Sequence, residues 1–306
     1  MRALVISGGG SRGAFAGGVA EYLINQLGYK YDIWVGTSTG SLLLCHLALD
    51  KVEKIKQVFT SVSPNDIFSL NPFIVRPDGD SYKVKINHIN VIRQFILGRK
   101  TFGESFKLKK LILEKLTEEE FENLKSSANE VVVTVANLSL NQVEYKSIKD
   151  YNYREFCEWI WTSCNFVPFM SLNEKNGYEY ADGGFGSKVP IEEAIHLGAK
   201  TIDVTILDSE MAGTNLLPSK NVFSLLTHLN LYMAERISRQ NIRIGKLIAR
   251  TKDVTLNFYY TPTSVTAHSS SLIFNAEKMK IWWDMGYHYA QTRNESSNEI
   301  RNSQKE

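Results

Sequence analysis

The chain of 306 residues is 43% hydrophobic and 22% charged, and its formal net charge is +2 at pH 7. These proportions are typical of a soluble globular protein, and the balanced charge without a polybasic or polyacidic tail argues against nucleic acid as a partner. The three cysteines, Cys45, Cys157 and Cys164, lack the close pairs of a zinc site. We therefore expect reduced thiols rather than metal ligands or disulfides.

Apolar runs bounded by turn residues alternate along the chain with segments of helical periodicity. Strands are predicted at 3–7, 33–36, 131–136, 143–147, 178–181, 201–207 and 254–259. Helices are predicted at 14–27, 38–49, 52–62, 106–116, 154–164, 191–197, 222–249 and 275–287. Strands that alternate with helices indicate an α/β fold with a mainly parallel central sheet covered on both faces.

No internal repeat or linker interrupts this alternation, which favours a single domain over residues 1–290. Segment 63–90 carries Pro64, Pro72 and Pro77 among scattered polar residues, and we expect an irregular excursion or cap there. Residues 291–306 are polar and lack apolar periodicity, which predicts a disordered tail.

The N-terminus enters an apolar run at once, with Arg2 the only charge ahead of it. This leaves no room for the basic region, apolar core and cleavage site of a signal peptide. The most apolar stretch, 33–49, is broken by a glycine-rich turn and is shorter than the roughly 20 residues that span a bilayer. The sequence predicts a cytoplasmic protein, peripheral to a membrane at most, without a signal peptide or a transmembrane segment.

The pentapeptide Gly36-Thr37-Ser38-Thr39-Gly40 matches the G-x-S-x-G pattern of a nucleophile elbow. A predicted strand precedes it and a predicted helix follows, and glycines at both ends allow strand and helix to pack closely around a sharply turned serine. Ser38 would lie at the helix N-terminus, where the helix dipole stabilises developing negative charge. The alternative is an ordinary turn in which Ser38 only caps the helix.

A histidine partner for Ser38 is hard to find. His46 lies along the predicted helix that follows the elbow, and a rise of about 1.5 Å per residue displaces it by roughly 12 Å. Four others lie in or near the expected cap or within predicted helices: His88, His196, His228 and His288. Only His268, in the loop 261–271, stays a candidate. An α/β-hydrolase triad is the weaker alternative, because only one predicted strand precedes the strand of the elbow.

A glycine-rich segment, Gly8-Gly9-Gly10-Ser11-Arg12-Gly13, follows the first predicted strand. Successive glycines let consecutive N–H groups turn toward one point, and the next helix adds its dipole, as an oxyanion hole requires. The segment also matches the G-x-G-x-x-G dinucleotide fingerprint. Asp32, however, precedes the second predicted strand, whereas the ribose-binding acid belongs at its far end. An oxyanion loop is favoured, and a nucleotide- or lipid-binding Rossmann-like module without hydrolysis is the alternative.

A single carboxylate, Asp182, directly follows the predicted strand 178–181 and is followed by Gly183 and Gly184. Burial beside apolar walls would raise its pKa, and a hydrogen bond to Ser38 would orient a proton transfer. Alone, Asp-Gly-Gly is an ordinary turn, so it indicates a catalytic role for Asp182 only in combination with the other two motifs. Asp203, Asp208 and His196 lack the spacing of metal ligands, so we expect no metal or other cofactor.

In this order the three motifs resemble those of the patatin-like phospholipase family. Segments 161–169 and 189–194 are similar to the family's stretches before and after the aspartate, although Cys164-Asn165 replaces small residues and puts the size of the acyl pocket in question. The resemblance implies a three-layer α/β/α sandwich and a calcium-independent lipid acyl hydrolase of the phospholipase A or lysophospholipase type. It also implies Ser38 as nucleophile, Asp182 as base, and the glycine segment as an oxyanion loop braced by Arg12.

A phospholipid or other acyl lipid is therefore the expected partner. Five basic residues recur at helical spacing on the predicted helix 222–249 and just beyond it: Arg236, Arg239, Arg243, Lys246 and Arg250. Such a basic stripe is usually the solvated face of a core-packed helix. Peripheral contact with an anionic membrane is the functional alternative.

Overall fold

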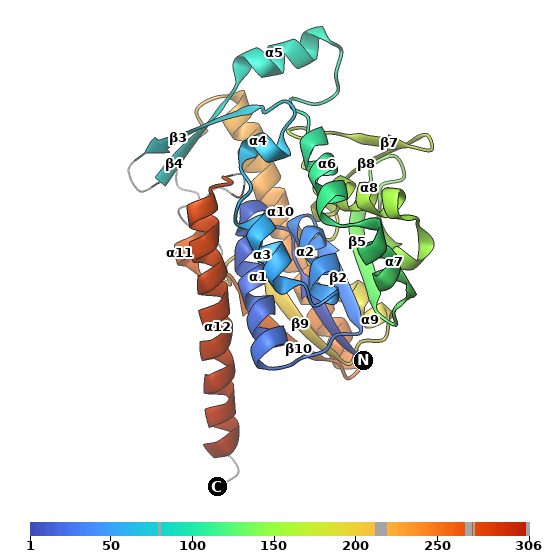
Figure 1. Cartoon of the computed structure of the whole chain (residues 1–306). Coiled ribbons are helices and arrows are strands. Elements are labelled where there is room, and N and C mark those ends of the chain that lie inside the picture. Colours follow the sequence, from blue (N-terminus) through green and yellow to red (C-terminus); the bar gives the residue numbers. More distant parts are fainter. Residues whose placement is uncertain (79–80, 212–218, 267–270, 272, 304–306) are drawn as a thin grey trace.

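A mainly parallel sheet lies at the centre of the computed structural model, which describes residues 1–78, 81–211, 219–266, 271 and 273–303 (Figure 1). Its strands are β1 (Arg2–Ile6), β2 (Ile33–Thr37), β5 (Glu130–Asn137), β6 (Gln142–Ser147), β7 (Asn173–Lys175), β8 (Tyr178–Asp182), β9 (Thr201–Ile206) and β10 (Thr255–Tyr260). They follow the order β10-β9-β1-β2-β5-β8-β7, and β6 pairs with β5. The five strands from β10 to β5 are parallel, and the pairs that involve β6, β7 and β8 are antiparallel.

The longer helices are α1 (Gly13–Glu21), α2 (Thr39–Ala48), α3 (Val52–Phe59), α5 (His88–Ile96), α6 (Phe106–Lys115), α7 (Glu118–Ser126), α8 (Tyr153–Ser163), α10 (Val222–Thr251) and α12 (Ala276–Ser303). Three shorter ones are α4 (Pro64–Ile67), α9 (Ile191–His196) and α11 (Thr263–Thr266). A separate hairpin is formed by β3 (Phe73–Asp78) and β4 (Ser81–Ile86).

Two apolar cores cover the two faces of the sheet. Leu4 and Ile6 of β1 face a core shared with α1, α2, α8 and α12, whereas Ala3 and Val5 face a second core shared with α9 and α10. Adjacent residues of a strand point to opposite faces, so a strand buried on both sides has a continuous apolar sequence. The predicted three-layer α/β/α sandwich with a mainly parallel sheet is confirmed.

Every predicted strand and helix has a counterpart in the structure, and the differences lie in the cap, in the tail and in the additional elements α7, β7 and α11. Segment 63–90 holds α4, the β3–β4 hairpin and the start of α5, where an irregular excursion was expected. Helix α7 has a Thr117–Glu120 capping box that the periodicity analysis missed. Residues 291–303, expected to be disordered, continue α12 as a helix, while 304–306 lie outside the described residues.

Tertiary contacts explain the longer C-terminal helix. Ala290 of α12 is fully buried, and the Asn294 side chain donates a hydrogen bond to the Tyr259 hydroxyl (3.3 Å). A Cβ atom on Gly286 would lie 2.1 Å from the Phe15 carbonyl oxygen, so α12 packs on α1 almost backbone to backbone. A helix with a polar sequence is stabilised here by packing that its own periodicity does not reveal.

Candidate active site

Ser38 lies between β2 and α2 in a strained backbone conformation, with φ 55° and ψ −124°. Such angles are rare for a residue with a side chain and are typical of a nucleophile elbow. The turn needs glycine at its end, because a Cβ on Gly40 would lie 2.3 Å from the Ile6 carbonyl oxygen. Gly36 approaches Gly40 and Ser41 in the same way. The structure therefore presents Ser38 at the carboxyl end of β2, on the first turn of α2.

A second serine supports this turn. The Ser38 N–H donates to Ser163 Oγ at 2.8 Å, and the Ser163 hydroxyl donates to the Thr134 carbonyl at 2.6 Å. Ser163 is fully buried at the end of α8, and its Oγ is also 3.0 Å from Ser41 Oγ. Ser163 lies inside segment 161–169, which resembles a stretch of the patatin-like phospholipases, but its sequence context alone predicts no role for it.

The edge of β5 brings Asp182 to Ser38. Parallel β2 ends where Thr37 pairs with Thr134, and antiparallel β8 ends where Asp182 pairs with Val135, the next residue of β5. The carboxyl ends of β2 and β8 thus meet along one edge of β5. As a result, the Ser38 hydroxyl and the Asp182 carboxylate lie beside each other and line one cavity.

Asp182 is 4% exposed, and burial raises its pKa to about 6. Hydrogen bonds from Ser38 and from the Gly184 N–H (2.7 Å to Oδ1), together with the charge of Lys188, act in the opposite direction. The loss of hydration is the larger effect, as expected for a carboxylate in an apolar wall. Gly183 packs against the Thr134 backbone, where a Cβ would lie 2.3 Å from the carbonyl oxygen.

The glycine loop connects β1 to α1 beside the elbow, and a Cβ on Gly8 would lie 3.2 Å from Ser38 Cβ. Two of its amides already have acceptors: Gly8 N–H donates to the Lys188 carbonyl (3.1 Å), and Ser11 N–H donates to the Ser271 carbonyl (2.9 Å). Within the described residues, the N–H groups of Gly9 and Gly10 have no recorded acceptor. Gly10 has φ +60°, which favours glycine.

Comparison with known proteins identifies the family of this chain. A family model for patatin-like phospholipases matches residues 4–195. The chain belongs to the patatin-like phospholipase family. No sequence among the curated proteins matches it. Among solved structures, the crystal structure of VipD from Legionella pneumophila is similar, with a TM-score of 0.50 and 13% sequence identity over 96% of this chain and 67% of that one.

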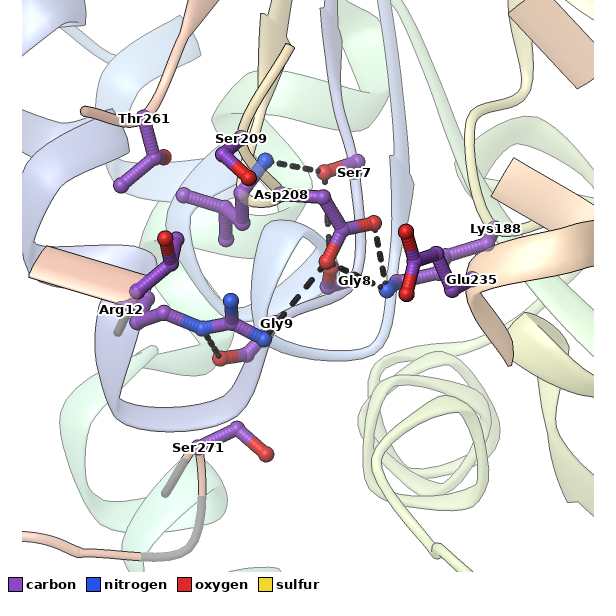
Figure 2. Close-up of polar contacts among 12 residues, drawn as sticks. Ser7, Gly8, Gly9, Arg12, Lys188, Asp208, Ser209, Glu235, Thr261 and Ser271 are labelled. Atoms are coloured by element: carbon purple, nitrogen blue, oxygen red, sulfur yellow. Dashed lines mark hydrogen bonds and ion pairs between the residues drawn. The ribbon is translucent and has the colours of Figure 1, made fainter. Parts of the chain in front are cut away.

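In this patatin-like protein a buried ion-pair cluster braces the glycine loop (Figure 2). Arg12 Nε donates to the Gly9 carbonyl (3.3 Å), and an Arg12 guanidinium nitrogen lies 3.6 Å from Asp208 Oδ1. Lys188 Nζ donates to both oxygens of Asp208, at 2.8 and 2.7 Å. Burial lowers the pKa of Arg12, while Lys188 and Arg12 hold the pKa of Asp208 below its usual range despite its burial. No sequence motif marks Lys188, and from the sequence Asp208 was weighed only as a metal ligand.

The three motifs open into one cavity of about 120 Å³. Its polar lining includes Ser38, Asp182 and the first three glycines of the loop. The remaining wall is largely apolar and includes Leu42, Leu108, Phe166, Met170 and Phe274. A neighbouring apolar cavity of about 70 Å³ shares Leu42, Ile67, Leu108 and Phe274 with it. The arrangement places a serine hydroxyl, a buried carboxylate and glycine N–H groups beside space suited to a hydrocarbon chain.

The basic stripe of α10 lies elsewhere. Four of its five residues line a separate cleft of about 440 Å³ that α10 forms with the ends of β9 and β10: Arg239, Arg243, Lys246 and Arg250. Arg239 pairs with Glu235 at 3.0 Å, one turn away on the same helix. The stripe therefore takes no part in the cavity around Ser38.

The other sequence-based expectations concern histidine, metal and membrane spans. His46 Nε2 bonds with the Lys115 carbonyl (3.0 Å), and His268 lies outside the described residues. Over the part of the chain that the structure describes, no group of three or more His, Cys, Asp or Glu could hold a metal ion. None of the described helices is long and apolar enough to cross a membrane.

Proposed function

We propose that this protein is a lipid acyl hydrolase of the phospholipase A or lysophospholipase type that acts through a Ser38–Asp182 dyad. The observation that carries the proposal is that the strained Ser38 lies beside the buried Asp182 in one cavity, where the Ser38 hydroxyl acts on the pKa of that carboxyl group. A carboxylate whose pKa lies near neutrality is a competent base for a hydroxyl that it already contacts. The family and the apolar cavity support a lipid ester as substrate.

The chemistry follows from the positions of these groups. Ser38 Oγ attacks the acyl carbonyl as its proton passes to Asp182, and the carbonyl oxygen becomes negatively charged. The unoccupied N–H groups of Gly9 and Gly10 are the candidate donors to that oxyanion. Collapse releases the alcohol, which takes the proton from Asp182 and leaves an acyl-enzyme. Water, deprotonated by Asp182, then hydrolyses this ester and restores Ser38.

Covalent labelling tests the nucleophile directly. We expect a fluorophosphonate ester to modify Ser38 in the folded protein, with the adduct identified by peptide mass spectrometry. Ser38→Ala should abolish labelling, and Ser61→Ala, a change at an exposed serine, should not. A folded wild-type protein that resists labelling at every pH would contradict the proposal. It would favour the alternative, a nucleotide- or lipid-binding module.

The nucleotide alternative has little support from the position of Asp32. Its carboxylate accepts a hydrogen bond from the Arg2 backbone N–H (2.8 Å) at the start of β2, the end opposite to Ser38. The ribose-binding acid of a dinucleotide fold lies instead at the carboxyl end of that strand. A panel of lipids with product mass spectrometry would identify the head group and the acyl position.

The pH dependence follows from the pKa of Asp182. Because only the ionised carboxylate accepts the Ser38 proton, activity should be half-maximal near the pKa of about 6. Below that pH, activity should fall about tenfold for each unit, the slope of a single titrating group. The measurement is kcat/KM on a soluble ester across the acidic range, at pH values where circular dichroism shows an intact fold. A flat profile down to pH 4, in the range of an ordinary carboxyl group, would contradict this assignment.

Two further expectations remain predictions. Activity should need no metal, so it should persist in excess chelator; a loss that added calcium restores would contradict this. Contact of the basic stripe with an anionic membrane also stays a prediction. A different surface of the protein, on α5, is a second candidate for membrane contact.

A further inference from the structure

Helix α5 exposes its apolar face. Ile89 and Ile96 are each 80% exposed, and Phe95 is 65% exposed. The buried positions of the helix are Val91 and Gln94, and the Gln94 amide nitrogen has no hydrogen-bond partner among the residues that the structure describes. An amphipathic helix on a globular protein normally shows the reverse arrangement. We define the α5 surface as Ile89, Ile92, Phe95, Ile96 and Leu97.

The α5 surface extends onto the first turns of α10. Exposed apolar residues recur there at helical spacing: Val222, Leu225, Leu229, Tyr232 and Met233. The ring of Phe223 contacts His88 at the start of α5, with 5.8 Å between ring centroids. Contiguous exposed apolar surface of this kind marks an interaction site.

This surface is connected to the cavity around Ser38 by packed side chains. In Figure 1, α5 stands above the body of the protein, at the end opposite the C-terminus. A series of aromatic contacts leads inward from Phe95 to Phe102, Phe169 and Phe166, with ring centroids 5.8 to 6.0 Å apart. Phe166 lines the cavity that contains Ser38, as does Leu231 of α10.

The charge of the residues around the α5 surface distinguishes between the partners that could cover it. From residue 81 to residue 103 the sequence has five basic residues and no acidic one: Lys83, Lys85, Arg93, Arg99 and Lys100. Arg99 and Lys100 have carboxylate partners, whereas no carboxylate of the described chain pairs with Arg93. A second copy of the chain would bring two basic surfaces together. An anionic lipid surface offers the complementary charge.

We propose that the α5 surface docks on an anionic phospholipid bilayer, with its apolar side chains inserted at the headgroup boundary and with the nearby exposed Lys85 and Arg93 against the lipid phosphates. Docking there would place the cavity mouth against the membrane, so that a lipid enters without crossing water. The role of this docking in delivering a substrate rests on the proposed function. Vesicle binding itself can be measured whether or not hydrolysis occurs.

The test compares two double variants of equal charge. Ile89→Asp with Ile96→Asp removes apolar contact from the α5 surface, and Leu140→Asp with Ile281→Asp makes the same change at exposed sites elsewhere. Sedimentation with phosphatidylcholine–phosphatidylglycerol vesicles should show at least about tenfold weaker binding for the α5 variant only. Binding of the wild type should weaken at high salt and on pure phosphatidylcholine. Hydrolysis of a soluble short-chain ester should stay within about twofold of the wild type, because the variant leaves the cavity intact.

A fluorescent reporter tests insertion itself. Ile92→Trp should show a blue-shifted emission on addition of anionic vesicles, as the indole leaves water. The inference is overturned if the α5 variant binds vesicles as well as the wild type, or if only Arg243→Glu with Lys246→Glu in the basic stripe abolishes binding. It is also overturned if the α5 change turns a dimer into a monomer without affecting vesicle binding. Vesicle binding that depends on α5 without any ester hydrolysis would instead contradict the proposed function alone.

Discussion

Replacing Asp182 with asparagine should lower turnover by about 10²–10⁴, the range for loss of a general base. Asparagine keeps the shape of the side chain but cannot take the Ser38 proton. Its amide can still accept from the Gly184 N–H, which now meets Oδ1 at 2.7 Å, so the local fold should survive. The measurement is kcat on a soluble ester, with binding to lipid vesicles followed in parallel.

Two controls test whether the loss of turnover is catalytic and whether a histidine takes part. Vesicle binding of Asp182→Asn should match the wild type, which separates a catalytic loss from a loss of adsorption. His268→Ala should change turnover little, since the dyad needs no histidine. A well-folded His268→Ala that is as damaged as Asp182→Asn would replace the dyad with a triad.

Replacing Gly10 with alanine should lower kcat by about 10²–10³, the typical effect of losing one oxyanion donor. The added Cβ would lie 2.0 Å from the Ser271 carbonyl oxygen, so the loop must move. Movement of the loop displaces the free N–H groups of Gly9 and Gly10 from the Ser38 side of the cavity. KM should change less than kcat, because the donors act mainly on the transition state.

A matched control is available for the backbone strain. Gly28 has φ +64°, close to the +60° of Gly10, but a Cβ there would meet nothing within 4 Å. Gly28→Ala therefore carries the same conformational penalty without displacing the loop. It should lower stability slightly and leave kcat unchanged. Equal losses of kcat in the two variants would argue that strain, and not a lost donor, is responsible.

The sequence by itself predicted the layered fold and the local geometry of the elbow. Apolar periodicity and turn residues act over short distances, so the segments around Ser38 specify strand, turn and helix almost independently of the rest. The three successive glycines likewise predicted a loop with freely oriented amides. The resemblance to patatin-like phospholipases rested on the same short motifs.

The cap, the tail and the support of the site depended on contacts between distant segments. Local periodicity did not show that α5 presents its apolar face outward, or that α12 packs on α1 and continues as a helix to Ser303. The position of Ser163 under the elbow, and of Lys188 and Asp208 behind the loop, required α8 and β9 to be packed on their neighbours. A buried polar contact between remote residues leaves no periodic signal in either segment.

The pairing of β8 shows the difference most clearly. The sequence predicted a strand that ends just before Asp182, but neither its antiparallel direction nor its register on β5. Only that register puts Asp182 opposite Val135 and beside the end of β2, within hydrogen-bond reach of Ser38. Strand register is set by side-chain packing across the whole sheet, and a shift of one residue would turn Asp182 to the other face. The sequence thus determined the chemical groups, and the tertiary structure decided that they meet.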